Sequence, residues 1–223
     1  MEIKKRRIFS IIILIFITLL ATFGVSNAIF RYLVTPSYKL NYVFWFALTR
    51  YTNISNILGL IASLISSIYL IRNKEYPFWL KILRFIAASF LLFTFVIVYV
   101  ILAPISKDWK LIYDPSYLLY THTIIPLATL FEYLYLDNKN KLLSYKLTFV
   151  STGLTLTYGI TIIIALLIVG NDNGAPYPFF EIHRLPPYQT VLFMLGLVTI
   201  SVILNLLFIY LSNLITKKRK IPS

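Results

Sequence analysis

Six apolar blocks of about 20 residues each take up most of this 223-residue chain. A helix of about 20 apolar residues spans the roughly 30 Å of hydrocarbon in a bilayer. The blocks cover about residues 8–30, 45–71, 80–103, 115–136, 147–169 and 188–214. Spans in lipid must satisfy their backbone groups within a helix or a closed barrel, and continuous apolar runs lack the alternation of a barrel. We therefore predict an all-α bundle of six transmembrane helices, which forms one transmembrane domain over residues 1–223.

The charge distribution predicts which side of the membrane each connection faces. The formal net charge is +13, from 21 Lys and Arg against 8 Asp and Glu. Fifteen of the basic residues lie at the two ends of the chain and beside alternate connections: Lys4, Lys5, Arg6, Arg7, Arg72, Lys74, Lys81, Arg84, Lys139, Lys141, Lys146, Lys217, Lys218, Arg219 and Lys220. Basic residues concentrate on the cytoplasmic side of membrane proteins. We expect both termini inside the cell, the protein in the plasma membrane, and no nucleic acid as a partner.

His122 is an ionisable residue well inside the fourth apolar block. Such a side chain is costly in a membrane, usually faces the bundle interior, and marks a functional site. It lies seven residues after Pro115, and Thr52 lies seven residues after Trp45. At a rise of about 1.5 Å per residue, each is about 10 Å along its helix. Because the second and fourth spans run in the same direction, we expect Thr52 and His122 at one depth in the outer leaflet.

Polar side chains follow one face of the second, fourth and fifth blocks. Their spacing is helical in each block, which places each set on a single face. The sets are Thr52, Ser55, Asn56, Gly59 and Ser63; His122, Pro126, Thr129 and Tyr133; and Thr148, Ser151, Thr155 and Tyr158. We expect Tyr133, Thr129, Thr155 and Tyr158 to line a cavity between these faces. The alternative is interhelical packing, for which small and hydroxylated residues are the usual choice.

These residue types supply the parts of an acyl-transfer site. A threonine hydroxyl is a poor nucleophile unless a base takes its proton, and a neutral imidazole can be that base. We predict Thr52 and His122 as the catalytic pair, with a lipid ester from the outer leaflet as the substrate. An amide donor such as Asn56, with Ser55 beside it, can stabilise an oxyanion. We predict that Arg50 binds a carboxylate head group. The alternative is a side chain whose charged end reaches the membrane–water interface and binds no substrate.

Two of these motifs resemble a known family. The segments 51–56 (Tyr-Thr-Asn-Ile-Ser-Asn) and 122–126 (His-Thr-Ile-Ile-Pro) resemble the signatures of the androgen-induced-gene/ADTRP-like membrane proteins. The segment 176–179 (Pro-Tyr-Pro-Phe) resembles their bacterial six-span relatives. The animal members are threonine hydrolases of fatty acid esters of hydroxy fatty acids. The resemblance implies Thr52 as nucleophile and His122 as base; Thr49 is a rival nucleophile that lacks the following Ser-Asn pair.

Other readings of the same chain stay open. Substrate-binding subunits of vitamin uptake systems are also small, basic, six-span proteins, so a small-molecule carrier is the alternative function. Heme or metal binding through His122 would find too few ligands, since the chain has no cysteine and one other histidine, and no cofactor is expected.

Two further features have two readings each. Glu132 lies near the cytoplasmic end of its block, where a paired or interfacial carboxylate is expected rather than a catalyst. The connection 170–187 carries Pro176 and Pro178, which restrict its backbone. It is either an interfacial aromatic belt or a cap over the outer mouth of a cavity.

Overall fold

The computed structural model describes residues 3–34, 50–115, 117–136, 142–170 and 175–220. Regular structure in these ranges is helical throughout. Five segments are long and apolar enough to cross a membrane. They are built from α1 (Ile3–Val34), α3 (Tyr51–Ile71), α4 (Phe78–Ile97), α8 (Leu147–Val169) and α9 (Pro187–Lys220). The third segment continues from α4 through a π-helical turn, η1 (Val98–Leu102), into α5 (Ala103–Ser106). These lengths and compositions are those of a multi-pass integral membrane protein, as the sequence predicts.

The fourth predicted span departs from a regular helix. Its helical part has three sections: η2 (Tyr120–Ile124), α7 (Ile125–Phe131) and η3 (Glu132–Leu136), of which η2 and η3 are π-helical. In η2 the Ile125 N–H donates to the Tyr120 carbonyl, five residues back. The next bond in that register would run from residue 126 to the Thr121 carbonyl, but Pro126 has no N–H. The Thr121 carbonyl therefore needs a donor from another helix.

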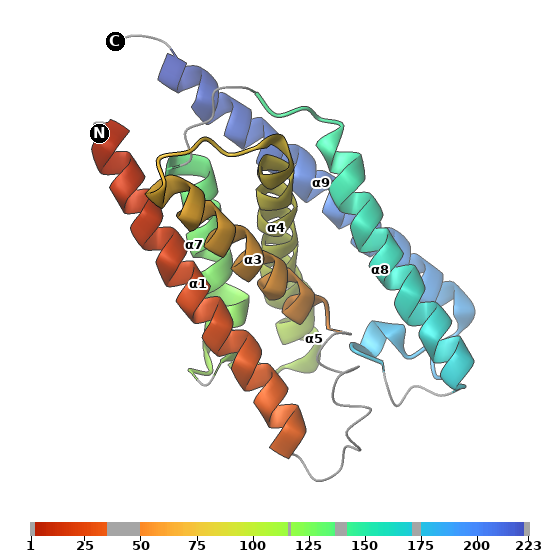
Figure 1. Ribbon diagram of the computed structural model, residues 1–223. Coiled ribbons are helices and arrows are strands. Elements are labelled where there is room, and N and C mark those ends of the chain that lie inside the picture. Colours follow the sequence, from red (N-terminus) through yellow and green to blue (C-terminus); the bar gives the residue numbers. More distant parts are fainter. Residues whose placement is uncertain (1–2, 35–49, 116, 137–141, 171–174, 221–223) are drawn as a thin grey trace.

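Four helical segments form one group, and two more pack beside it. Helix α3 contacts α1, α4 and α7, helix α7 also contacts α1 and α4, and the α8–α9 pair lies against α4 (Figure 1). The start of α1 and the end of α9 lie at the same end of the bundle (Figure 1). The opposite end carries α5, the short helix α6 (Lys110–Tyr113) and the 3₁₀ turn η4 (Pro178–Phe180).

Small and hydroxylated side chains hold neighbouring helices together. Thr18 of α1 and Ser63 of α3 share a hydrogen bond of 2.9 Å. Gly59 allows a close approach of α4, because a Cβ there would lie 3.0 Å from a methyl carbon of Leu91. Thr152 of α8 bonds to α9 in the same way, through Ser201 at 3.3 Å. The polar face of α3 is buried as predicted, and for Gly59 and Ser63 its role is helix packing.

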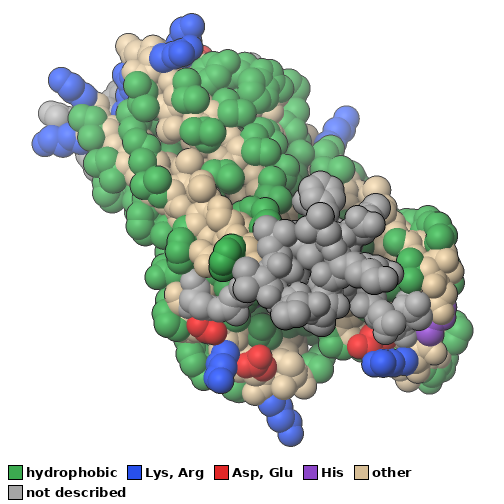
Figure 2. Space-filling model, turned by 60° about the horizontal axis from the view of Figure 1, so that its bottom comes forward, with side chains coloured by type: hydrophobic (Ala, Val, Ile, Leu, Met, Phe, Trp, Pro, Cys, Tyr) green, Lys and Arg blue, Asp and Glu red, His purple; other side chains and the backbone are tan. Residues whose placement is uncertain are grey.

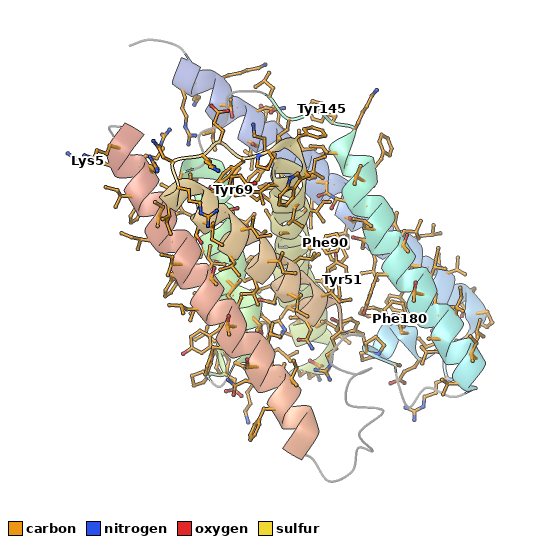
Figure 3. The ribbon with its side chains drawn as sticks, in the orientation of Figure 1. Lys5, Tyr51, Tyr69, Phe90, Tyr145 and Phe180 are labelled. Carbon is orange, nitrogen blue, oxygen red and sulfur yellow. The ribbon has the colours of Figure 1, made fainter. Side chains whose placement is uncertain are left out.

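Aromatic rings connect the four-helix group to the α8–α9 pair. The Tyr51 ring lies 5.0 Å from that of Phe90 on α4 and 5.1 Å from that of Tyr158 on α8. Tyr158 in turn lies 6.2 Å from Phe180 of η4. Figure 3 labels Tyr51, Phe90 and Phe180 along this seam. Ring pairs at these separations add stability beyond the area they bury.

A buried ion pair joins α4 to η3. The Arg84 guanidinium donates to the Glu132 carboxylate at 2.6 Å, and the Ser10 hydroxyl donates to its other oxygen at 2.6 Å. Both charged side chains are nearly inaccessible, at 4% and 2% exposure. Arg84 also lies over the ring of Tyr76, 4.3 Å from its centroid. The expectation that Glu132 is a paired carboxylate is confirmed.

Two arginines cap helix ends at the end of the bundle that carries the termini. Arg7 donates to the Leu70 carbonyl in the last turn of α3. Arg219 donates to the carbonyls of Leu134 and Tyr135 in η3, at 3.0 and 2.7 Å. The last carbonyls of a helix have no partner within it, and a cation there is favoured by the helix dipole.

The outer surface of the bundle is apolar along its length. Figure 2 shows hydrophobic side chains over the flank, and charged side chains gathered towards the two ends. Such a belt is the surface that lipid would cover.

Candidate functional site

Thr52 and His122 line the same cavity, which has a volume of about 480 Å³. Its walls come from the start of α3, from η1, α5, α6 and η2, and from the connection before α9. The lining includes Arg50, Thr52, Asn53, Val98, Leu111, Tyr117, His122, Pro176, Tyr177 and Phe179. This volume is in the range of small-molecule sites, and the mixture of an apolar wall with a few polar groups is typical of them.

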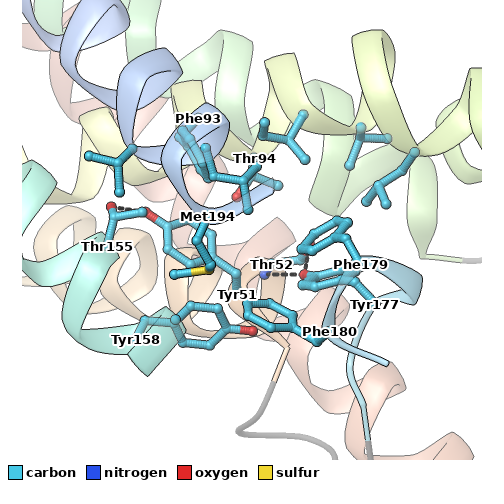
Figure 4. Close-up of a pocket in the computed structure, with 16 residues that line it drawn as sticks. Tyr51, Thr52, Phe93, Thr94, Thr155, Tyr158, Tyr177, Phe179, Phe180 and Met194 are labelled. Atoms are coloured by element: carbon cyan, nitrogen blue, oxygen red, sulfur yellow. Dashed lines mark hydrogen bonds between the residues drawn. The ribbon is translucent and has the colours of Figure 1, made fainter. Parts of the chain in front are cut away.

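A second, much smaller cavity of about 30 Å³ lies next to the first. Thr155 and Tyr158, two of the predicted cavity residues, line this one together with Tyr51 and Met194 (Figure 4). The two cavities share a wall that includes Thr52 and Tyr177. Thr155 is held there by the Tyr51 hydroxyl at 2.9 Å.

One ring nitrogen of His122 makes a hydrogen bond with a backbone carbonyl. Nδ1 lies 2.6 Å from the carbonyl oxygen of Leu111 in α6. A carbonyl can only accept, so we assign the hydrogen of this bond to Nδ1, and in a neutral ring the lone pair is then on Nε2. The neighbouring Thr123 hydroxyl donates to the Ile112 carbonyl at 3.2 Å. Helix α6 thus fixes the orientation of His122, as carboxylates and carbonyls fix histidines in many active sites.

Thr52 lies in the first turn of α3, where backbone N–H groups have no partner within the helix. Its N–H donates to the Tyr177 hydroxyl at 3.4 Å, and its own hydroxyl lies 3.4 Å from the same oxygen. Figure 4 draws the bond from the Thr52 N–H to Tyr177 among the residues that line the smaller cavity. Among the described residues, the hydrogen-bond partner of the Thr52 hydroxyl is therefore Tyr177. His122 lies with Thr52 on the lining of the larger cavity.

The Asn56 side chain links Thr52 to Thr121, the residue before His122, and it lines neither cavity. Its amide donates to the Thr52 carbonyl at 2.8 Å and to the Thr121 carbonyl at 3.1 Å. The second bond supplies the donor that Pro126 cannot give to Thr121. Both amide hydrogens are occupied in this arrangement, so none is left to donate to an oxyanion, and the side chain ties the start of α3 to the turn before His122.

Three other predicted residues lie away from the larger cavity. The Ser55 hydroxyl bonds to the Thr52 carbonyl at 2.8 Å and to the Thr94 hydroxyl at 2.9 Å, which makes it a packing residue between α3 and α4. Tyr133 packs on Phe208 of α9, with ring centroids 5.2 Å apart. Tyr133 and Thr129 line neither of the two cavities. The π turns explain this, because they widen the helix and shift the phase that a regular 3.6-residue repeat would give from His122.

The connection before α9 closes one side of the site. Pro176, Tyr177 and Phe179 line the larger cavity, and the rings of Tyr177 and Phe179 stack at 5.2 Å. Phe179 and Phe180 are buried. This is the arrangement of a cap, which was one of the two readings of the segment 170–187.

Sequence reasoning missed two contributors to the site. Tyr177 lies in the segment 170–187, for which the sequence predicts an aromatic belt or a cap but no contact with Thr52. The Leu111 carbonyl had no signal at all, because every residue carries one. Arg50, by contrast, is a predicted residue that does line the larger cavity.

The arrangement brings a hydroxyl, an oriented imidazole and a cation to one apolar cavity. Among the described residues, no group of three or more His, Asp or Glu side chains is placed to hold a metal ion. Comparison with known protein families, curated proteins and solved structures found no match to this chain.

Proposed function

We propose that this protein is an intramembrane hydrolase of lipid esters, with Thr52 as the nucleophile and His122 as the base. One observation carries the proposal: both residues line a single cavity of about 480 Å³, and the Leu111 carbonyl orients His122 so that Nε2 is its proton acceptor. A hydroxyl becomes an effective nucleophile when such a base takes its proton.

The proposed reaction has two steps through an acyl-enzyme. The Thr52 hydroxyl oxygen bonds to the ester carbonyl carbon while its proton moves to His122 Nε2. The bond to the alcohol then breaks, and the alcohol leaves with that proton. Water attacks the acyl-threonine in the same manner, with His122 taking the proton from water and returning it to Thr52.

The lining of the cavity supports a lipid as the substrate. Its walls are mainly aliphatic and aromatic side chains, and Arg50 adds one cation among them. An acyl chain fits the apolar wall, and a carboxylate or another anionic head group fits the cation. Resemblance of the segments 51–56 and 122–126 to the androgen-induced-gene/ADTRP-like proteins points to the same substrate class.

The proposal includes a membrane topology. The helical run from η2 through η3 is a further span, the fourth in chain order, which brings the total to six. Both termini are cytoplasmic, and the site opens in the outer half of the plasma membrane. The concentration of Lys and Arg at the chain ends and alternate connections supports this orientation. The position of both termini at one end of the bundle agrees with an even number of spans.

A small-molecule carrier is the second candidate function. The cap formed by Pro176, Tyr177 and Phe179 over the cavity suits the capture of a ligand as well as its hydrolysis. A tightly bound small molecule found by mass spectrometry of the purified protein, without ester turnover, would favour the carrier.

The experiment is ester turnover by purified protein in liposomes that carry a panel of lipid esters. Thr52→Ala and His122→Ala should each abolish turnover, with the loss appearing in kcat. Matched controls are Thr161→Ala, on the lipid-facing side of α8, and His183→Ala, outside both cavities. Wild-type turnover on no ester of the panel, or full activity in Thr52→Ala, would rule the hydrolase out.

A further inference from the structure

The proposed reaction needs donors for the negative charge that develops on the ester oxygen, and Asn56 cannot supply them. Both of its amide hydrogens are held by backbone carbonyls. Two other donors meet at Thr52. One is its own backbone N–H, in the first turn of α3, which donates to the Tyr177 hydroxyl oxygen at 3.4 Å. The other is the Tyr177 hydroxyl, whose oxygen lies 3.4 Å from the Thr52 hydroxyl oxygen. Both contacts are long for hydrogen bonds, so a substrate oxygen can replace them.

We infer that Tyr177 is a catalytic residue of the proposed hydrolase, and that its hydroxyl and the Thr52 backbone N–H together form the oxyanion site. The inference rests on the function proposed above. It assigns to the capping connection a part in the chemistry, beyond closing the cavity.

The position of Tyr177 follows from where the charge forms. When the Thr52 oxygen bonds to the carbonyl carbon, the electron pair of the C=O bond moves to the carbonyl oxygen. The carbonyl oxygen is attached to the carbon under attack, so it lies next to the Thr52 hydroxyl oxygen. The Tyr177 hydroxyl already lies 3.4 Å from that Thr52 oxygen, and it can therefore reach the carbonyl oxygen as well. The Tyr177 proton stays on its own oxygen throughout, and the pair returns when the C=O bond re-forms.

The surroundings keep Tyr177 a donor and hold it in place. Burial raises the pKa of the Tyr177 hydroxyl above its ordinary value, so it is protonated at neutral pH. The N-terminal end of a helix dipole is positive and stabilises a negative charge beside it. Thr52 lies in the first turn of the 21-residue α3. Stacking on Phe179 fixes the ring of Tyr177, so its donor is in position before the substrate binds.

The test is Tyr177→Phe, which keeps the ring and its stacking and removes only the hydroxyl. With p-nitrophenyl decanoate in detergent micelles as the probe, kcat should fall by about 10²–10³-fold, as for other single oxyanion donors. KM should stay close to wild type, because the hydrogen bond strengthens only when the charge forms. The matched control is Tyr210→Phe on the exposed side of α9, which should keep full activity.

The outcomes separate this inference from the function on which it rests. Wild-type turnover with an unchanged kcat in Tyr177→Phe overturns the oxyanion assignment and leaves the hydrolase standing. Absence of wild-type turnover overturns both. If Tyr177→Phe is not recovered folded, Tyr177→His, which keeps a donor N–H, is compared with Tyr177→Leu, which has none. Equal kcat in those two variants would also overturn the assignment.

Discussion

Asn56→Ala should destabilise the protein by about 2–3 kcal/mol, because it removes the amide that joins α3 to η2. The two amide donations run to the carbonyls of Thr52 and Thr121. The two carbonyls are affected differently when the amide is removed. The Thr52 carbonyl still accepts from the Ser55 hydroxyl at 2.8 Å, whereas the Thr121 carbonyl faces the one position in its turn that has no N–H, Pro126.

The magnitude comes mainly from the Thr121 carbonyl. A buried acceptor left without a donor costs about 1–3 kcal/mol, and an ordinary hydrogen bond contributes about 1 kcal/mol net. Side-chain hydrogen bonds between membrane helices average about 0.6 kcal/mol, which is less than in water-soluble proteins. The predicted loss of about 2–3 kcal/mol is therefore the lower part of the range that the two contributions give together. Part of the cost is offset, since Asn56 Oδ1 is itself buried without a hydrogen-bond partner among the described residues.

Asn56→Asp sharpens the prediction. Carboxylate oxygens would then face two carbonyl oxygens at about the present distances, so Asn56→Asp should be less stable than Asn56→Ala although its shape is closer to Asn. The measurement is the free energy of unfolding from an SDS titration in dodecyl maltoside micelles, with Asn27→Ala as the control. The Asn27 amide donates to the Phe23 carbonyl one turn back in α1, which is a bond within a single helix.

Two results would refute this reasoning. If Asn56→Ala unfolds within about 0.5 kcal/mol of wild type, the Thr121 carbonyl is satisfied some other way. If Asn56→Asp equals wild type in stability, the amide does not act as a double donor. A stable Asn56→Ala protein that keeps full ester turnover would show that the bridge holds the helices without positioning Thr52 and His122.

Three further predictions concern stability. Glu132→Ala should cost about 3–5 kcal/mol in SDS unfolding, because it leaves a buried guanidinium without its carboxylate; a cost below 1 kcal/mol would contradict this. Gly59→Leu should cost about 1–3 kcal/mol by crowding Leu91, while Gly153→Leu, with open space around it, should cost little; equal losses would remove the packing argument. The raised pKa of Tyr177 predicts that its contribution to stability is complete below the ordinary tyrosine pKa of about 10 and is lost as pH rises through the folded value; the stability difference between wild type and Tyr177→Phe should therefore shrink above pH of about 10, and a constant difference would refute it.

Much of the fold could be predicted from the sequence. Apolar blocks of span length gave the helices, and five of the six correspond to segments that can cross a membrane. The buried polar face of α3 followed from helical spacing, and Glu132 was expected to be paired. The fourth block was harder, because Pro126 and the π turns on either side of α7 break the regular repeat, and the cavity roles predicted for Thr129 and Tyr133 depended on that repeat.

The sequence by itself determined which segments are helical and which of their faces are polar. Lipid imposes that result locally, since each span must satisfy its own backbone and hide its own polar side chains. Only the tertiary structure decided that Leu111 orients His122, that Asn56 bridges Thr52 and Thr121, and that Tyr177 reaches Thr52 across 125 positions of the chain. Those contacts use backbone carbonyls, a helix start and a connecting segment. Nothing in a residue's type marks such groups, because their partners are set by how the helices pack.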